Sequence, residues 1–261
     1  MTWLRVVVVG GLLSYRALFV WLRPGLFTAT LLATPAMQIS FFALLGPSLT
    51  PLPLEHFVIG NAIQTCAIAS TFGMSQMLER ERVQQTLPWL VLTPAHRSAV
   101  YLGRMLPNIL NGLAVAAFGI AFGRIVLGAQ LAPGAVPRLA AALLVGTLSC
   151  TALGVVVGAV GLVSRDTQSL TSVLYLLLLV VSGANVPIDA LPGPLAWLST
   201  VLPLRGSIQA ARSATSLAPA ELWAPAVGRE LLVAVAYTAV GYVCVRAFER
   251  WSRAAATLEL Y

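Results

Sequence analysis

The chain has 261 residues, of which 58% are hydrophobic and only 10% are charged. A soluble domain carries about 25% charged residues, and a core that hides this much apolar surface from water is implausible at this length. The net charge is +7 and all sixteen basic residues are arginine, which excludes a standard ATP-binding P-loop because that motif needs a lysine.

The composition therefore predicts an all-α membrane protein, folded as a single transmembrane domain over residues 1–261. The arginines are spread along the ends of apolar segments rather than clustered. This distribution fits membrane orientation better than nucleic-acid binding, so we expect no nucleic-acid partner.

The N-terminal segment, residues 1–23, is apolar but interrupted by Arg5, Arg16 and Arg23. A signal peptide needs an uninterrupted apolar core, which these arginines exclude. We predict an amphipathic helix that lies on the cytoplasmic face of the membrane. The alternative is a ragged additional span.

Six apolar stretches follow and predict six spans, at approximately 25–46, 57–78, 105–124, 139–163, 167–188 and 227–248. The sixth is the weakest, because its charge-free part, Leu231–Val245, covers only about 22 Å of a hydrocarbon core of about 30 Å. Arg229, Glu230 and Arg246 must therefore reach an interface or find partners there.

The segment between the fifth and sixth predicted spans is apolar but broken by prolines, including Pro187, Pro192 and Pro203. Its uncharged run 190–204 is too short and too rich in proline to cross a bilayer. We predict two short re-entrant helices that dip into the outer leaflet, where protein or water must surround their irregular backbone.

Arginine counting predicts the orientation. With both termini on the cytoplasmic side, eleven of the sixteen arginines fall in inner segments and five in outer ones. This bias supports an even number of spans.

The longest charged stretch follows the second predicted span and begins with an alternating run, Glu79, Arg80, Glu81 and Arg82. An apolar patch at 89–92 comes next, and then Thr93 and Pro94. Such an element can lie along the cytoplasmic membrane surface and offer its charges to a partner. The alternative is a solvated loop that only sets the topology.

This loop resembles the segment of ABC-2 type permeases in which an acidic-basic run precedes a "GTLE…LL.TP" pattern. The matching residues are Glu81, Arg82, Thr86, Leu87, Leu90, Leu92, Thr93 and Pro94. Gln85 and Pro88 depart from the pattern, since they replace the usual glycine and acidic residue.

A second segment, just before the last predicted span, resembles the "SG…P…LP.WL…LPL……AR" signature of the same family. The matching residues are Ser182, Gly183, Pro187, Leu191, Pro192, Leu195, Trp197, Leu198, Leu202, Pro203, Leu204 and Arg212. The number and order of the spans also agree with the family, so the resemblance covers nearly the whole chain.

The resemblance implies that two permease copies, as a homodimer or a heterodimer, sit on two separately encoded cytoplasmic ABC ATPases. ATP and Mg would bind those partners, and no cofactor would bind this chain. The implied ATPase-coupling residues are Glu79, Arg80, Glu81, Arg82, Thr86, Thr93, Pro94 and Arg97. Pro187, Pro192, Trp197, Pro203 and Arg212 would belong to short outer helices that cap the exit.

Other patterns carry less weight. The chain contains no catalytic motif, and His56 and His96 fall on opposite sides of the membrane in this topology, so we expect no metal site. Gly154 and Gly158 form a small-xxx-small pattern that lets helices approach closely. Arg165 and Asp166 predict a local ion pair in a short inner turn.

We therefore expect a non-enzymatic permease of the bacterial plasma membrane that exports a hydrophobic or amphipathic compound, such as a drug, a natural product or a lipid. The alternatives are a polysaccharide-exporting permease, a secondary transporter and a non-transporting anchor. The near absence of ionisable residues in the central spans argues against a proton-coupled transporter.

Overall fold

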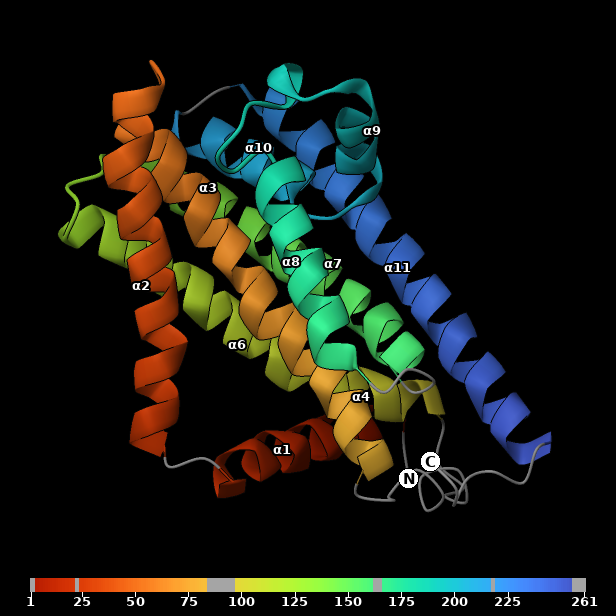
Figure 1. The fold of residues 1–261 in the computed structure, drawn as a ribbon. Helices are drawn as coiled ribbons and strands as arrows, with labels where there is room; N and C mark the ends of the chain where they lie inside the picture. The colour runs from red at the N-terminus through yellow and green to blue at the C-terminus, as the bar shows by residue number, and fades with distance from the viewer. Residues whose placement is uncertain (1–2, 22–23, 84–96, 162–165, 217–218, 255–261) are drawn as a thin grey trace.

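The computed structural model describes residues 3–21, 24–83, 97–161, 166–216 and 219–254. These residues form helices joined by turns, with no strand among them, as the predicted all-α class requires. Helices α2, α6, α7 and α11, the pair α3–α4 and the shorter α8 form one bundle (Figure 1). Helix α1 lies across one end, beside α4, and we call this the α1 end; α9 and α10 lie at the opposite, α10 end.

Five described helical segments are long and apolar enough to cross a membrane: Leu31–Leu49, Leu54–Arg80, Ala99–Ile125, Val136–Gly161 and Glu221–Phe248. They belong to α2 (Pro24–Leu49), the continuous unit of α3 (Leu54–Ala67) and α4 (Gly73–Val83), α6 (Arg97–Ile125), α7 (Val136–Gly161) and α11 (Ala220–Ala254). A single 3₁₀ turn, Pro133–Ala135, precedes α7. The chain is a multi-pass membrane protein.

The fifth predicted span corresponds to α8, Thr167–Val181, which has only 15 residues and a length of about 22 Å. The sixth predicted span corresponds to α11, which has 35 residues and a length of about 52 Å. The sixth predicted span, whose charge-free part is short, therefore continues through its charged flanks as one long helix. Glu230 faces the protein interior, where it is 1% exposed, so the charges at 229–230 do not mark the end of a lipid-facing helix.

The second span changes its helical register in the middle. Between α3 and α4, residues Ile68–Phe72 form one π-helical turn, and the backbone stays helical on both sides of it. The Thr71 hydroxyl donates a hydrogen bond to the Cys150 carbonyl of α7, at 3.0 Å. This contact ties the π turn to the neighbouring span.

Gly154 and Gly158 bring α7 against this part of the second span. A Cβ atom on Gly154 would lie 2.8 Å from the Thr71 carbonyl oxygen, and one on Gly158 would lie 2.6 Å from the Leu78 side chain. The predicted close-packing role of this glycine pair is confirmed as a contact within the chain.

Helix α1, Trp3–Trp21, occupies the position of the predicted N-terminal helix and crosses α6 at the α1 end (Figure 1). The crossing is close because two glycines face each other. A Cβ on Gly11 would lie 3.0 Å from the Gly103 carbonyl oxygen, and a Cβ on Gly103 would lie 2.8 Å from the Val7 carbonyl oxygen.

Two short helices stand between α8 and α11, as the proline-broken segment predicts. After a 3₁₀ turn at Ile188–Ala190, α9 spans Gly193–Val201 and α10 spans Arg205–Thr215. Together they cover the α10 end of the bundle (Figure 1).

Candidate functional site: a clamped helix pair and the opposite charged end

Prolines set the boundaries of the two short helices. Pro187 precedes the 3₁₀ turn, Pro192 precedes α9 and Pro203 lies in the connection to α10. Proline cannot donate the backbone hydrogen bond that would continue a helix, so each one starts or ends an element. Trp197 of α9 is 63% exposed, which suits an aromatic side chain at a membrane interface.

Arg212, in the last turn of α10, ties this helix to two spans. Its guanidinium donates hydrogen bonds to the carbonyls of Gly183 (2.9 Å) and Ala184 (2.9 Å), just beyond α8, and of His56 (3.0 Å) in α3. Burial lowers the Arg212 pKa to about 10, so the group keeps its charge at neutral pH. A cation at a helix C-terminus also opposes the helix dipole favourably.

Gly60 makes room for the Arg212 contact. A Cβ atom at this position would lie 2.7 Å from the Ala184 carbonyl oxygen and 2.8 Å from the Arg212 guanidinium. The predicted site residue Arg212 is thus a structural clamp between α10, α8 and α3, a role that sequence matching alone did not specify.

Glu230 of α11 holds the other end of α10. Its Oε1 accepts a hydrogen bond from the backbone N–H of Leu204 (2.7 Å), and its Oε2 accepts from Gly206 (3.0 Å) and Ser207 (3.4 Å). The Ser149 hydroxyl of α7 also bonds Oε1. Backbone N–H groups at a helix N-terminus lack intrahelical partners, so the carboxylate satisfies donors that would otherwise be buried without one.

The backbone at this junction is strained. Leu204, which precedes α10, has a φ of 84°, a conformation that an ordinary side chain disfavours. Such a residue persists where the surrounding contacts fix it, and the hydrogen bond from its N–H to Glu230 is one such contact. Ser207 adds another, because its hydroxyl donates to the Ala142 carbonyl of α7 at 2.7 Å.

Two further arginines secure α9. Arg205 donates to the Ser199 hydroxyl at 2.9 Å, and Arg229 donates to the carbonyls of Ser199 (3.3 Å) and Thr200 (3.1 Å). Arg246, near the other end of α11, donates to the Tyr242 hydroxyl at 3.0 Å. The two arginines expected to find partners beside the sixth span therefore do so, whereas Glu230 turns inward.

Part of the predicted coupling set lies in the described residues, at the α1 end. Helix α4 ends at Val83, with Glu79 half-buried and Arg80 exposed. The backbone of Glu81 and Arg82 belongs to α4 and that of Arg97 begins α6, but their side chains lie outside the described part of the structure. Thr86, Thr93 and Pro94 lie outside the described residues altogether.

The segment before α8 is described from Asp166 onward. The Asp166 carboxylate accepts a hydrogen bond from the Ser169 N–H at 3.0 Å and so caps α8. Hydrogen bonding by the Ser169 side chain, and then by its backbone, lowers the pKa of that carboxyl group. Arg165, the expected ion-pair partner, lies outside the described residues.

Neutral polar side chains bridge α2, α3, the middle of α8 and the segment after α8. The Gln38 amide donates to Asn61 at 3.2 Å, Asn61 donates to Asn185 at 2.7 Å, and the Tyr175 hydroxyl donates to Gln38. One turn below Asn61, the Gln64 amide is fully buried. Sequence reasoning missed both this cluster and the cap formed by Glu230; an acidic residue beside an apolar helical run was the available signal.

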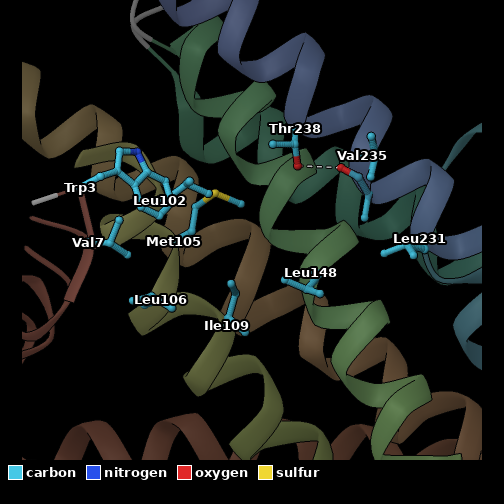
Figure 2. Close-up of a pocket in the computed structure, with 11 residues that line it drawn as sticks. Trp3, Val7, Leu102, Met105, Leu106, Ile109, Leu148, Leu231, Val235 and Thr238 are labelled. Atoms are coloured by element: carbon cyan, nitrogen blue, oxygen red, sulfur yellow. Dashed lines mark hydrogen bonds between the residues drawn. The ribbon is translucent and has the colours of Figure 1, made fainter. Parts of the chain in front are cut away.

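An apolar groove lies between α1, α6, α7 and α11 (Figure 2). Its volume is about 390 Å³. Its lining residues are Trp3, Val7, Leu102, Met105, Leu106, Ile109, Leu148, Leu231, Ala234, Val235 and Thr238. The Thr238 hydroxyl is bonded to the Ala234 carbonyl of its own helix at 2.7 Å, so the groove suits hydrocarbon rather than a polar group.

Comparison with known proteins gives one positive result. Residues 53–243 match the model of a family described as ABC-2 family transporter protein. The match starts just before α3 and ends within α11, so it includes the π turn, α10 and both of its clamps. No curated protein matches the chain.

Proposed function

The chain belongs to the ABC-2 family of transporter proteins, and from this premise we propose that it is the six-span permease of an ATP-driven exporter. Membership makes the chain the membrane component of an ABC transporter, which works with an ATPase subunit. The direction of transport, the number of spans and the roles of the two ends are our proposals.

The observation that carries the proposal is the course of the second span. It leads from His56, whose carbonyl binds Arg212, through the π turn at Ile68–Phe72 to the charged end of α4. A push on α4 at the α1 end can therefore reach α10 at the opposite end through one continuous element. π turns occur frequently at functional sites.

We assign the α1 end to the cytoplasm and to the ATPase. The arginine bias supports this orientation, with both chain termini inside a bacterial plasma membrane. The coupling set would then be Glu79, Arg80, Glu81, Arg82, Thr86, Thr93, Pro94 and Arg97. The α10 end, with α9, would form a re-entrant cap over the exit in the outer leaflet.

We count α8 as the fifth span. Its 15 residues cover about 22 Å, and the turn through Ser182–Gly183 adds to this length. A sixth crossing puts both termini on one side. The permease would pair with a second copy of itself or with a homologous chain, while ATP and Mg bind the partner ATPases.

The cargo is expected to be hydrophobic or amphipathic. The apolar groove between α6 and α11 supports this class, because its lining offers hydrocarbon contacts. A polysaccharide cargo remains the alternative within the family, and the neutral cluster of Gln38, Asn61 and Tyr175 is the feature that favours it. Glu230 does not favour a proton-coupled transporter, since backbone amides occupy both of its oxygens.

The proposal is tested by reconstituting the permease in proteoliposomes with the ABC ATPase encoded beside it. The permease alone should hydrolyse no ATP, and the complex should hydrolyse ATP and move a fluorescent amphipathic dye in an ATP-dependent manner. Charge reversal at Glu79 and Arg80 should lower the amount of dye moved per ATP, because these charges stand at the ATPase contact.

The matched control is charge reversal at Glu221, which is exposed in α11 near the opposite end and should leave this ratio unchanged. ATP hydrolysis by the permease alone would refute the assignment as a transport subunit. Dye movement that depends on a proton gradient and does not require ATP would favour a secondary transporter instead.

A further inference from the structure

Helix α10 is anchored to two different groups of spans, one at each of its ends. At its C-terminal end, Arg212 binds carbonyls of α3 and of the segment after α8. At its N-terminal end, the binding partners are Glu230 of α11 and, through Ser149 and Ala142, α7. The helix therefore bridges α3 and the segment after α8 at one end and α7 and α11 at the other.

The N-terminal anchor consists of the Glu230 side chain and one further hydrogen bond, from the Ser207 hydroxyl to the Ala142 carbonyl of α7. The backbone N–H groups of Leu204, Gly206 and Ser207 all donate to the Glu230 carboxylate, and the side chain is 1% exposed. Gly206 lets α10 approach α11 closely, since a Cβ there would lie 2.5 Å from the Ala226 carbonyl oxygen and 3.0 Å from the Glu230 Cβ. Three donors that converge on two oxygens need an acceptor at both oxygens, which the carboxylate provides.

We propose that Glu230 is a positioning residue that locks the N-terminal end of α10 to α11, so that α10 relays movement of α3 to the exit. The relay part of this inference rests on the proposed function; the lock itself does not. With the lock in place, a displacement of α3 pulls α10 through Arg212 while its other end stays on α11. Without it, the N-terminal end of α10 loses its hydrogen bonds to α11 and keeps the Ser207 bond to α7, while its C-terminal end stays tied to α3 and the segment after α8.

The chemistry of substitution separates the lock from general packing. Glu230→Gln preserves the size of the side chain but replaces one oxygen with an NH₂ group, which donates and cannot accept. At least one of the three N–H groups then faces another donor, and the strained Leu204 backbone loses part of its support. Glu221→Gln makes the same chemical change on an exposed residue of the same helix and serves as the matched control.

The test measures two distances by electron paramagnetic resonance on spin-labelled, full-length permease in nanodiscs. Cysteines at Gln209 (α10) and Leu232 (α11) report on the Glu230 end. Cysteines at Ser216 and Val180 (α8) report on the Arg212 end. All four positions are exposed, and the three native cysteines are replaced by alanine.

Glu230→Gln should broaden the 209–232 distance distribution and add a longer component, while the 216–180 distribution stays narrow. Arg212→Gln should produce the reverse, and Glu221→Gln should change neither. If Glu230→Gln does not fold, Glu230→Asp is measured in the same way. Aspartate keeps the negative charge, but its side chain is one methylene shorter, so the carboxylate lies farther from the N–H groups of α10.

A merely structural role would lower the unfolding temperature and leave both distributions of the folded protein unchanged, and that result would overturn the proposal. Equal broadening at both ends would overturn it too. Since the measurement uses neither ATPase nor cargo, its outcome is independent of the proposed transport function.

Discussion

Individual glycines decide how closely the spans of this protein approach one another. Gly154 is a clear case, because a Cβ there would meet both the Thr71 carbonyl oxygen at 2.8 Å and the Met74 Cβ at 2.9 Å. Neither contact can yield by rotation of a flexible side chain. A substitution at Gly154 therefore tests whether close contact between α7 and the π turn stabilises the fold.

Gly154→Ala should lower the stability of the folded protein, since inserting a methyl group into a packed contact costs about 1–3 kcal/mol. Gly228→Ala is the control, because Gly228 of α11 has no atom within 4 Å of its Cβ position, and alanine favours a helix by up to about 1 kcal/mol. Thermal unfolding in detergent measures the difference. Equal unfolding temperatures for the two variants would contradict the packing.

The sequence predicted these residue contacts unevenly. The spacing of Gly154 and Gly158 indicated a close helix contact but not its partner, because periodicity describes one helix at a time. Arg212 was found through a family pattern. Glu230 was placed at the end of a span and expected to lie near an interface. The sequence alone does not show whether a carboxylate beside an apolar run faces the membrane interface or binds the N-terminus of a buried helix.

At the scale of elements, the α1–α6 crossing joins the N-terminal helix to the span that follows the charged loop. Gly11 faces Gly103 and Leu106 across this crossing, whereas Gly10, the adjacent residue, has nothing within 4 Å of its Cβ position. Gly10 and Gly11 are therefore neighbouring positions of one helix, of which only Gly11 lies in the contact, so Gly10 can serve as the control for Gly11. If α1 transmits force beside the ATPase, its attachment to α6 must be firm.

Gly11→Leu should loosen α1 from α6, and Gly10→Leu should not, because only the former places a side chain between the two backbones. Hydrogen exchange followed by mass spectrometry measures this directly. We expect faster exchange in the α1 peptide of the Gly11 variant. Similar exchange in both variants would show that the glycine contact does not hold the helix.

The elements themselves were largely predictable. Apolar runs indicated where the long described helices lie, although α6 begins at Arg97, before the predicted start at 105, and the prolines between 187 and 203 predicted the break into α9 and α10. The relative lengths of the fifth and sixth predicted spans could not be predicted, since a helix can continue past its apolar run through charged residues, as α11 does at the buried Glu230 and at the exposed Arg250. The same limit applies to the π turn at Ile68–Phe72, which has no compositional mark.

At the scale of the whole molecule, the protein has two unlike ends. The α1 end carries α1 and the charged end of α4, and the α10 end carries the clamped pair α9–α10 (Figure 1). The second span and α10 form a continuous path of contacts between these ends. The central claim is that these ends face opposite sides of the membrane, with the charged end toward the ATPase.

Sided cysteine labelling tests this claim most directly. Arg80 in α4 and Asp189 after α8 are both exposed, so a single cysteine at either position can react with a membrane-impermeant maleimide. We predict that Asp189→Cys is labelled in intact cells and Arg80→Cys only in inside-out vesicles. Labelling of both positions from the same side, or of Arg80→Cys in intact cells, would contradict the account.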